Sequence, residues 1–303
     1  RPTVTDANLV LGRFGTTGLL GGEMPLDEKR TRDVFQSAKG QLGTVEQFAE
    51  GITRVVNAQM EKALRKISVE YGYDPRDFLL LSFGGAGPLH ACALAKALSI
   101  PTVVVPRMPG ALSAYGIFVS DAVRNYSRTV MLAPTDPRLE QHFEDLEQLS
   151  LRESAGAESG KSFRSVDLRY VGQGYEIEID WADDPTELFH REHERRYGYA
   201  DRTRRVEAVT VRVRSVVASE TPPVRELEKR EGASRQAVLG KKQMYYGGHW
   251  FSGLVYDREK LHAGDSFSGP AVVTEYSATT FVPPDCRVAV DGFLNMVMDV
   301  PAN

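Results

Sequence analysis

One segment, residues 78–90, constrains the fold more than any other. It reads FLLLSFGGAGPLH. An apolar run of this length is typical of a buried strand, and three glycines within four residues then end it. Pro88 follows where the first turn of a helix would begin, a position at which its missing N–H costs nothing. A strand, a glycine turn and a helix N-terminus together present free backbone N–H groups and a positive dipole end, which favours a bound nucleotide.

The spacing of the glycines excludes two common nucleotide-binding motifs. They stand at 84, 85 and 87, so His90 occupies the place of the third glycine of a dinucleotide-binding G-x-G-x-x-G turn. No acidic residue follows about twenty positions on, where VVVPRMPG stands at residues 103–110, and no Gly-Lys-Ser/Thr completes a P-loop. The residues alone leave one alternative open, an ordinary turn in which glycine only permits close packing.

The first part of the chain has the pattern of an α/β fold. Apolar residues recur at intervals of three and four from Thr44 to Tyr71, which predicts a long helix with Thr44 and Gln47 as its capping box. We expect a strand at 78–83, a helix at 88–98, a strand at 102–105 and a helix from about Gly110. Before residue 40 we expect irregular structure with one short helix near residues 8–11.

The period changes to two beyond about residue 130. Alternating residues predict a hairpin over 166–181 and a strand at 209–213, and short strands are expected near 271–276, 279–282, 287–291 and 295–300. A surface loop is expected at 154–160. The sequence therefore predicts two domains, an α/β domain over residues 1–130 and a β-rich domain over residues 131–303.

Composition and charge limit the partners and the compartment. The net charge of −4 gives no reason to expect nucleic acid or an anionic membrane as a partner. No apolar run approaches the length of a bilayer span. Cys92 and Cys286 stand far apart in the sequence, and Cys92 falls in an Ala/Leu-rich helix, where we expect a small buried apolar residue. A reducing cytoplasm fits this cysteine usage.

The chain resembles the hydantoinase A/5-oxoprolinase family, which includes N-methylhydantoinases. Three segments carry the resemblance: TVTDANLVLGR at 3–13, FGGAGPLH at 83–90 and VVVPRMPGALSAYG at 103–116. Further matching segments follow in the family's order at 71–77, 168–173, 193–198 and 269–273. The likeness therefore runs over nearly all 303 residues.

The resemblance implies a fold and a cofactor. It implies part of an actin/hexokinase/Hsp70-like (ribonuclease H-like) ATPase lobe followed by a β-rich domain. Gly84, Gly85, Ala86 and Gly87 would then match the loop on the adenosine side of bound ATP. Gly110, Ser113 and Gly116 would match the small-residue helix that connects the lobes. The family's glycine/threonine/aspartate hairpins for the ATP phosphates, and with them Mg²⁺ binding, are absent from this sequence, so we expect the chain to be the C-terminal part of a longer protein.

Two residues are weaker candidates for catalysis. Asp6 could assist a divalent cation or a substrate amide, although capping of the helix at residues 8–11 accounts for it more simply. His90 lies one turn into the helix after the glycines and could approach a ligand, or could be an ordinary histidine of that helix. His190 and His193 lack the i, i+4 spacing of a metal-binding pair, and we expect His193 to pack on the β-rich domain instead. We expect no metal ligands in the sequence.

Several functions stay open at this stage. The resemblance implies ATP-dependent opening of a cyclic amide such as a hydantoin or 5-oxoproline, carried out with a hydantoinase B-type partner subunit or domain and in a homo-oligomer. Within the same family, a subunit of an ATP-dependent acetone/acetophenone-type carboxylase is the alternative. A third hypothesis is that the chain by itself is a non-catalytic module that binds a partner. No nucleophile motif such as G-x-S-x-G occurs.

Overall fold

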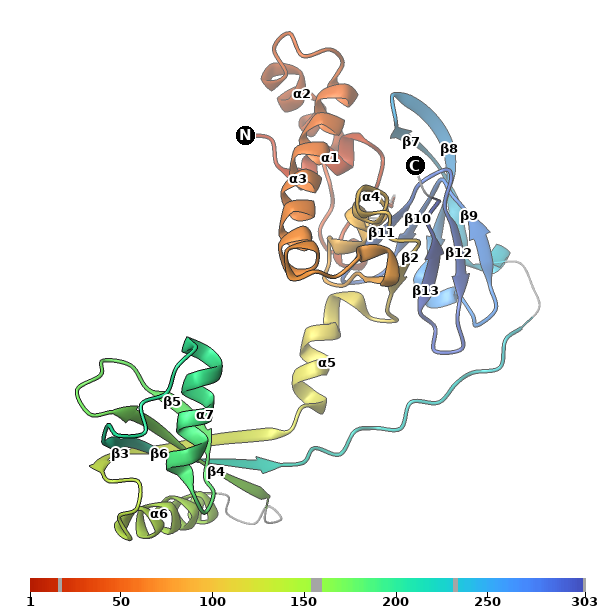
Figure 1. Ribbon diagram of the computed structural model, residues 1–303. Coiled ribbons are helices and arrows are strands. Elements are labelled where there is room, and N and C mark those ends of the chain that lie inside the picture. The colour runs from red at the N-terminus through yellow and green to blue at the C-terminus, as the bar shows by residue number, and fades with distance from the viewer. Residues whose placement is uncertain (16–17, 154–159, 231–233, 302–303) are drawn as a thin grey trace. The chain divides into compact units, whose positions relative to one another are not determined.

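The chain folds into two compact units. The computed structural model describes residues 1–15, 18–153, 160–230 and 234–301 (Figure 1), so the loop expected at 154–160 lies outside the described residues except for Gly160. The first unit comprises Arg1–Ile117 with Pro223–Asn303, and the second comprises Phe118–Pro222. This division differs from the domains expected at 1–130 and 131–303, because the last strands of the chain return to the sheet of the first unit.

Among the described residues of the first unit, four α-helices carry buried side chains. They are α1 (Val4–Val10), α2 (Glu28–Ala38), α3 (Val45–Ile67) and α4 (Gly87–Leu98). The capping box of Thr44 and Gln47 begins α3 as predicted, and the helix ends at Ile67, somewhat earlier than expected. The described residues before residue 40 contain two α-helices, whereas the sequence predicts one. The sequence does not predict α2, because a helix with only Phe35 buried gives almost no apolar periodicity.

The first sheet of this unit is mixed. Its order is β1-β2-β13-β12-β9, with β1 (Leu80–Leu81), β2 (Thr102–Val105), β9 (Ser266–Ser268), β12 (Arg287–Val290) and β13 (Met296–Asp299). The predicted β-α-β unit is confirmed, since β1 pairs in parallel with β2, but β1 is shorter than the strand expected at 78–83. β13 pairs antiparallel with β2, joining Met298 to Val103.

The second sheet shares its core with the first. Its order is β11-β10-β8-β7, with β7 (Val238–Tyr246), β8 (His249–Asp257), β10 (Ala271–Thr274) and β11 (Thr279–Val282). One buried apolar cluster joins α4 with strands of both sheets through Ala95, Val103, Val273, Val288 and Met298. α4 packs against β11 and β2 (Figure 1). The glycine turn before α4 therefore lies at the edge of this buried core.

The second unit is a four-stranded antiparallel sheet with two helices. Its order is β3-β6-β4-β5, with β3 (Ala122–Leu132), β4 (Lys161–Tyr170), β5 (Ile177–Asp180) and β6 (Val206–Val217). The predicted hairpin is confirmed as β4 and β5. Helices α6 (Arg138–Glu153) and α7 (Pro185–Tyr197) bury Phe143 and Phe189 in one core with Leu168 and Tyr170 of β4.

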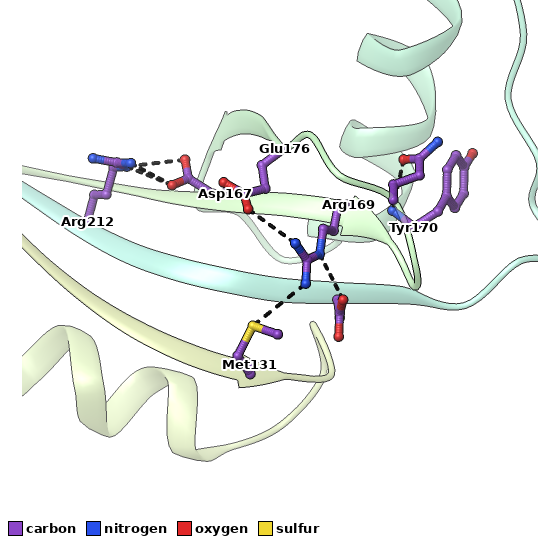
Figure 2. A network of polar contacts seen from close by, with 8 residues as sticks. Met131, Asp167, Arg169, Tyr170, Glu176 and Arg212 are labelled. Carbon is purple, nitrogen blue, oxygen red and sulfur yellow. Dashed lines mark hydrogen bonds and ion pairs between the residues drawn. The ribbon is translucent and has the colours of Figure 1, made fainter.

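Polar residues of β4 alternate with its apolar ones. Arg169 donates to Glu207 at 2.8 Å and to Glu176 at 3.4 Å, and Arg212 contacts Asp167 through hydrogen bonds of 2.6–3.1 Å (Figure 2). Successive strand residues point to opposite faces, so this polar network lies on the face of the sheet opposite to Leu168 and Tyr170. Its charges are paired with one another, which identifies it as a stabilising feature of the fold.

Shorter elements complete the chain. Helix α5 (Leu112–Val119) follows the 3₁₀ turn Pro109–Ala111, and none of its residues is buried. Other 3₁₀ turns lie at Leu20–Gly22, Val69–Tyr71, Pro75–Asp77, Ser234–Ala237 and Arg258–Lys260. Within the described residues, no helix combines the length and the apolar composition needed to cross a bilayer.

Candidate functional site

The predicted glycine turn forms one wall of a cavity, which we call the glycine-loop cavity. It has a volume of about 400 Å³. Its walls are α1 with Phe14, the start of α4 with Gly85 and His90, and the loop 274–279 that joins β10 to β11. Apolar side chains such as Leu19 and Leu89 dominate the lining, with a few polar groups among them. A concave, largely apolar site with few polar groups is the usual form of a small-molecule binding site.

The loop 274–279 explains Gly85, and the backbone conformation explains Gly84. The Thr279 N–H donates to the Gly85 carbonyl at 3.2 Å. A Cβ added at Gly85 would lie 2.9 Å from the Ser277 carbonyl oxygen, too close for any side chain. Gly84 has φ +84°, a conformation that favours glycine, and its N–H donates to Pro109 at 2.7 Å. Gly85 and Ala86 line the cavity, whereas Gly84 and Gly87 shape the turn behind it.

The second predicted glycine segment serves a different purpose. A Cβ at Gly110 would overlap the Ser277 side chain, so Gly110 allows the loop 274–279 to pack against it. Ser113 and Gly116 are exposed on α5, and a Cβ at Gly116 would meet nothing within 4 Å. The described residues thus bring Gly110 to the back of the cavity wall, and they place neither Ser113 nor Gly116 in its lining.

His90 is neutral and oriented. It is only 5% exposed, and its Nδ1 lies 2.8 Å from Oδ1 of Asn57 on α3. Because an amide oxygen only accepts, this contact requires Nδ1 to carry the proton, which leaves Nε2 as an acceptor. Burial, with repulsion from Arg13 added to it, lowers the pKa of His90 to about 4. His90 lines the glycine-loop cavity and can accept a hydrogen bond there at neutral pH.

Asp6 has a structural role in α1. Thr3 is the N-cap, and Asp6 at the third helical position accepts the Thr3 N–H at 2.9 Å and its hydroxyl at 2.8 Å. Asp6 is therefore the reciprocal partner in a capping box, and not the N-cap that the sequence suggested. Its neighbours Thr5 and Asn8 line the cavity.

A second cavity, which we call the arginine cavity, lies behind the first. Its volume is about 640 Å³, and α3, α4 and the turn at Gly247–Gly248 line it together with Arg13. The Arg13 side chain is 5% exposed, donates from Nη1 to Asn8 Oδ1 at 3.2 Å and lies 4.7 Å from the centre of the Phe281 ring. Burial lowers the pKa of Arg13 to about 10, which still leaves the guanidinium charged at neutral pH.

The two cavities share a wall that two hydrogen bonds cross. Leu89 lines both cavities. Asn8 of the glycine-loop cavity is bound to Arg13 of the arginine cavity, and His90 of the first is bound to Asn57 of the second. Sequence reasoning missed Arg13 and Asn57. Arg13 is the last residue of the family-like segment at 3–13, which was the available signal for it. Asn57 follows Ala49 and Thr53 at intervals of four along α3, so its signal was a polar residue on the inner face of that helix.

Glu275 is a further ionisable group that sequence reasoning missed. It lines the glycine-loop cavity and also a third cavity, of about 590 Å³, which contains Arg107 and Arg258. Burial raises the pKa of Glu275 to about 7, although the nearby charge of Arg258 opposes the shift. Within the described residues its Oε1 has no hydrogen-bond partner. Glu275 can therefore exchange a proton near neutral pH.

The remaining histidine and cysteine candidates are held by the fold. His190 contacts the Tyr170 hydroxyl at 2.9 Å, and His193 contacts the Tyr199 carbonyl at 2.8 Å within an aromatic cluster of the second unit. Among the described residues, no group of three or more His, Cys, Asp or Glu side chains is placed to hold a metal ion. Cys92 and Cys286 are free, buried and close in space despite their separation in sequence. A hydrogen bond with Cys286, together with burial, raises the pKa of the Cys92 thiol.

Comparison with known proteins identifies the family. Residues 1–126 match the hydantoinase/oxoprolinase family, and residues 138–297 match the hydantoinase/oxoprolinase C-terminal domain. The chain belongs to the hydantoinase/oxoprolinase family. The resemblance found in the sequence is thereby confirmed.

Curated relatives of this family member cover nearly all of its length. It is 36% identical to an uncharacterized protein of Methanocaldococcus jannaschii over 97% of this chain and 44% of that protein. It is 32% identical to the caprolactamase subunit alpha of Pseudomonas jessenii over 96% of this chain and 45% of that subunit. Other relatives include 5-oxoprolinases and subunits of acetone and acetophenone carboxylases. The chain thus spans about half the length of the first two relatives.

Solved structures support the fold of this hydantoinase/oxoprolinase chain. Nucleotide-free acetone carboxylase aligns with a TM-score of 0.81 at 24% identity, over 98% of this chain and 46% of that one. The ATP-dependent caprolactamase of Pseudomonas jessenii aligns with a TM-score of 0.66 at 30% identity, over 99% of this chain and 47% of that one. The expected class, an α/β lobe with a β-rich domain, is confirmed by these neighbours.

Proposed function

We propose that this chain is part of an ATP-dependent enzyme that opens a cyclic amide. The observation that carries the proposal is its 32% identity to a caprolactamase subunit over 96% of the chain. The alignment with an ATP-dependent caprolactamase structure at 30% identity supports the same reading. The substrate class is a lactam or a related ring amide, such as a hydantoin or 5-oxoproline.

The glycine-loop cavity is our candidate for the adenosine site of an actin-like ATPase fold. Gly85 and Ala86 offer backbone with at most a methyl group, which a flat base or ribose can approach, and Leu19, Phe14 and Leu89 add apolar surface to the lining. Neutral His90 offers an acceptor for an amino or hydroxyl hydrogen of the nucleoside. Gly84, Gly87 and Gly110 serve this site indirectly, since they permit the turn and the packing of the loop 274–279.

ATP, when bound, would supply the phosphoryl group that activates the amide oxygen so that water can open the ring. The residues described here bind and orient in this scheme: Oδ1 of the Asn57 side chain holds the His90 proton on Nδ1, and the apolar lining excludes water. For Mg²⁺ the described residues offer no fitting set of ligands, and the oxygens of Asp6 are engaged by Thr3. We therefore assign no metal ligand, and no catalytic role for Asp6, to this chain.

A carboxylase subunit is the second candidate. The acetone carboxylase beta subunit of Xanthobacter autotrophicus is 28% identical over 93% of this chain, somewhat less than the caprolactamase subunit. Since several relatives are subunits of larger enzymes, either function would require a partner subunit or domain of the hydantoinase B type, and we expect a homo-oligomer of such pairs.

Coupled ATP hydrolysis distinguishes these functions. In the assembled enzyme, we expect ADP release to depend on a cyclic amide, with caprolactam, 5-oxoproline and hydantoin tested in turn. Release that needs bicarbonate and a ketone instead would favour the carboxylase. Failure of both, together with failure of Mg-ATP to bind, would leave the chain as a partner-binding module. Ala86→Phe should fill the exposed mouth of the glycine-loop cavity and weaken ATP binding, while Ala58→Phe at an exposed position of α3 should not.

A further inference from the structure

The arginine cavity contains a buried cation without an ion-pair partner. Arg13 is 5% exposed, and among the described residues no carboxylate lies within 4 Å of its guanidinium. Arginine is almost never so deeply buried unless it is paired, because removing its charge from water is costly. Its one side-chain hydrogen bond is the contact of Nη1 with neutral Asn8, at 3.2 Å, and Nε has no partner within the part of the chain that the structure describes.

The nearest acidic group does not fill this role. Glu50 lines the same cavity and its charge acts on Arg13, but its Oε1 accepts the Gly247 N–H at 2.7 Å. The face of the Phe281 ring, 4.7 Å from the guanidinium carbon, contributes a cation–π attraction that compensates only part of the cost of burial. Arg13 therefore forms no ion pair within the described residues, and its Nε donor is unused.

A second cation lines the cavity from α3. Arg54 is exposed one turn before Asn57, and within the described residues it forms no ion pair. Amide groups of Gln47 and Asn57 lie in the same lining. Two arginines against one carboxylate leave the cavity with a net positive charge, and guanidinium groups with neighbouring amides are the donors that carboxylate and phosphate oxygens prefer.

We infer that the arginine cavity is a binding subsite for a small oxyanion, a carboxylate or a phosphate group, with Arg13 at its floor and Arg54 at its rim. The subsite lies behind Leu89, outside the glycine-loop cavity, and the inference does not depend on a nucleotide occupying that first cavity. Its occupant could be the carboxylate of a substrate or a phosphate group, which share the chemistry that Arg13 recognises.

Calorimetric titration of the 303-residue chain tests this inference. Inorganic phosphate and glutarate are titrated separately, with sodium chloride keeping the ionic strength constant. We expect saturable binding of at least one of them to a single site. Binding of phosphate alone would identify a phosphate group as the occupant, and binding of glutarate alone a carboxylate. Arg13→Met, which keeps the side chain's bulk, should weaken the binding roughly 10- to 100-fold, as the loss of a charge-assisted hydrogen bond does.

Matched variants on one helix separate this site from general charge effects. Arg54→Gln should weaken binding several-fold, whereas Lys62→Gln, an equal loss of charge two turns further along α3, should not. Ala86→Phe in the glycine-loop cavity should also leave anion binding unchanged. Loss of ATP binding, which would bear on the proposed function, is therefore distinguished from loss of anion binding. If Arg13→Met does not fold, anion binding is compared between Arg54→Glu, which should weaken it, and Lys62→Glu, which should not. The inference is overturned if neither anion binds saturably, or if binding is the same in the Arg13 and Arg54 variants as in the parent chain.

Discussion

Nδ1 of His90 lies 2.8 Å from Oδ1 of Asn57, which joins the start of α4 to the middle of α3. The contact fixes the tautomer of a buried imidazole that faces the glycine-loop cavity. Arg13 lies close enough to repel a proton on the same ring. The three residues come from α4, from α3 and from the segment after α1, so they connect the nucleotide-site candidate with the anion-site candidate.

Removing the charge of Arg13 should raise the pKa of His90. Burial is the larger cause of its depression and repulsion by Arg13 the smaller one, so in Arg13→Gln we expect a value above about 4 but still below the ordinary 6.5. Proton NMR titration of the imidazole measures this, with His90→Gln used to assign the signal. Arg54→Gln is the control, since Arg54 does not contribute to the shift. An unchanged His90 pKa in Arg13→Gln would contradict the electrostatic link.

The contribution of His90 to the stability of the first unit should decrease as the pH falls below about 6.5. The unfolded chain protonates this histidine near pH 6.5, whereas the folded chain does so only near pH 4. Between these values the unfolded state binds more protons at this residue, so the His90 contribution to the free energy of unfolding decreases as pH falls, by up to about 1.4 kcal/mol per pH unit. Glu275, whose pKa is raised to about 7 in the folded chain, contributes a change of the opposite sign, which is common to the parent chain and the His90 variant. His90→Gln should remove the His90 part of the slope, and His249→Gln, at an exposed position, should not.

Trp250 reports this transition. The protein has two tryptophans, one in each unit, so in a Trp181→Phe background the fluorescence of Trp250 follows the first unit alone. If the free energy of unfolding changed with pH equally in the parent chain and in His90→Gln between pH 4 and 6.5, protonation of His90 on unfolding would be contradicted.

Gly110→Ala should destabilise the first unit although it adds only a methyl group. The new Cβ would overlap the side chain of Ser277 and would press on its backbone, so the loop 274–279 must shift, at a cost of about 1–3 kcal/mol. Gly116→Ala is the matched control, because its Cβ would lie in open space within a helix, where alanine is favoured over glycine by about 1 kcal/mol. Urea unfolding followed by Trp250 compares them. Equal stability of the two variants would argue against the Ser277 contact.

Arg212→Ala should destabilise the second unit. It leaves Asp167, which is 4% exposed, without the guanidinium that binds both of its carboxylate oxygens (Figure 2). Loss of such a partner costs about 1–3 kcal/mol. Arg214→Ala, two residues along the same face of β6 and exposed, should change stability by less than about 0.5 kcal/mol. Fluorescence of Trp181 in a Trp250→Phe background follows this unit, and equal effects of the two variants would contradict the account.

The sequence predicts the elements of this fold better than their assembly. The long helix with the capping box of Thr44 and Gln47, the parallel pairing of β1 with β2 and the β4–β5 hairpin all have local signatures, and all are observed. The pairing of β2 with β13 joins residues about two hundred positions apart, and no local pattern encodes it. The boundary expected at residue 130 differs from the observed units for this reason.

The candidate site shows the same limit. The glycine turn and His90 stand out in the sequence because glycine and histidine have special local properties. Arg13 and Asn57 stand out only because they are placed beside Asn8 and His90. These contacts depend on how α1, α3 and α4 pack, which no local sequence pattern shows. The sequence shows that Gly110 lacks a side chain, but only the structure shows that the Ser277 side chain leaves no room for one. The roles of the glycine segment and His90 in nucleotide binding stay predictions.

A structure with bound Mg-ATP, or with a non-hydrolysable analogue of it, tests the central claim most directly. The account predicts density for the adenosine in the glycine-loop cavity, against the backbone of Gly85 and Ala86 and within hydrogen-bonding distance of His90 Nε2. An ordered nucleotide bound elsewhere, with this cavity empty, would contradict it.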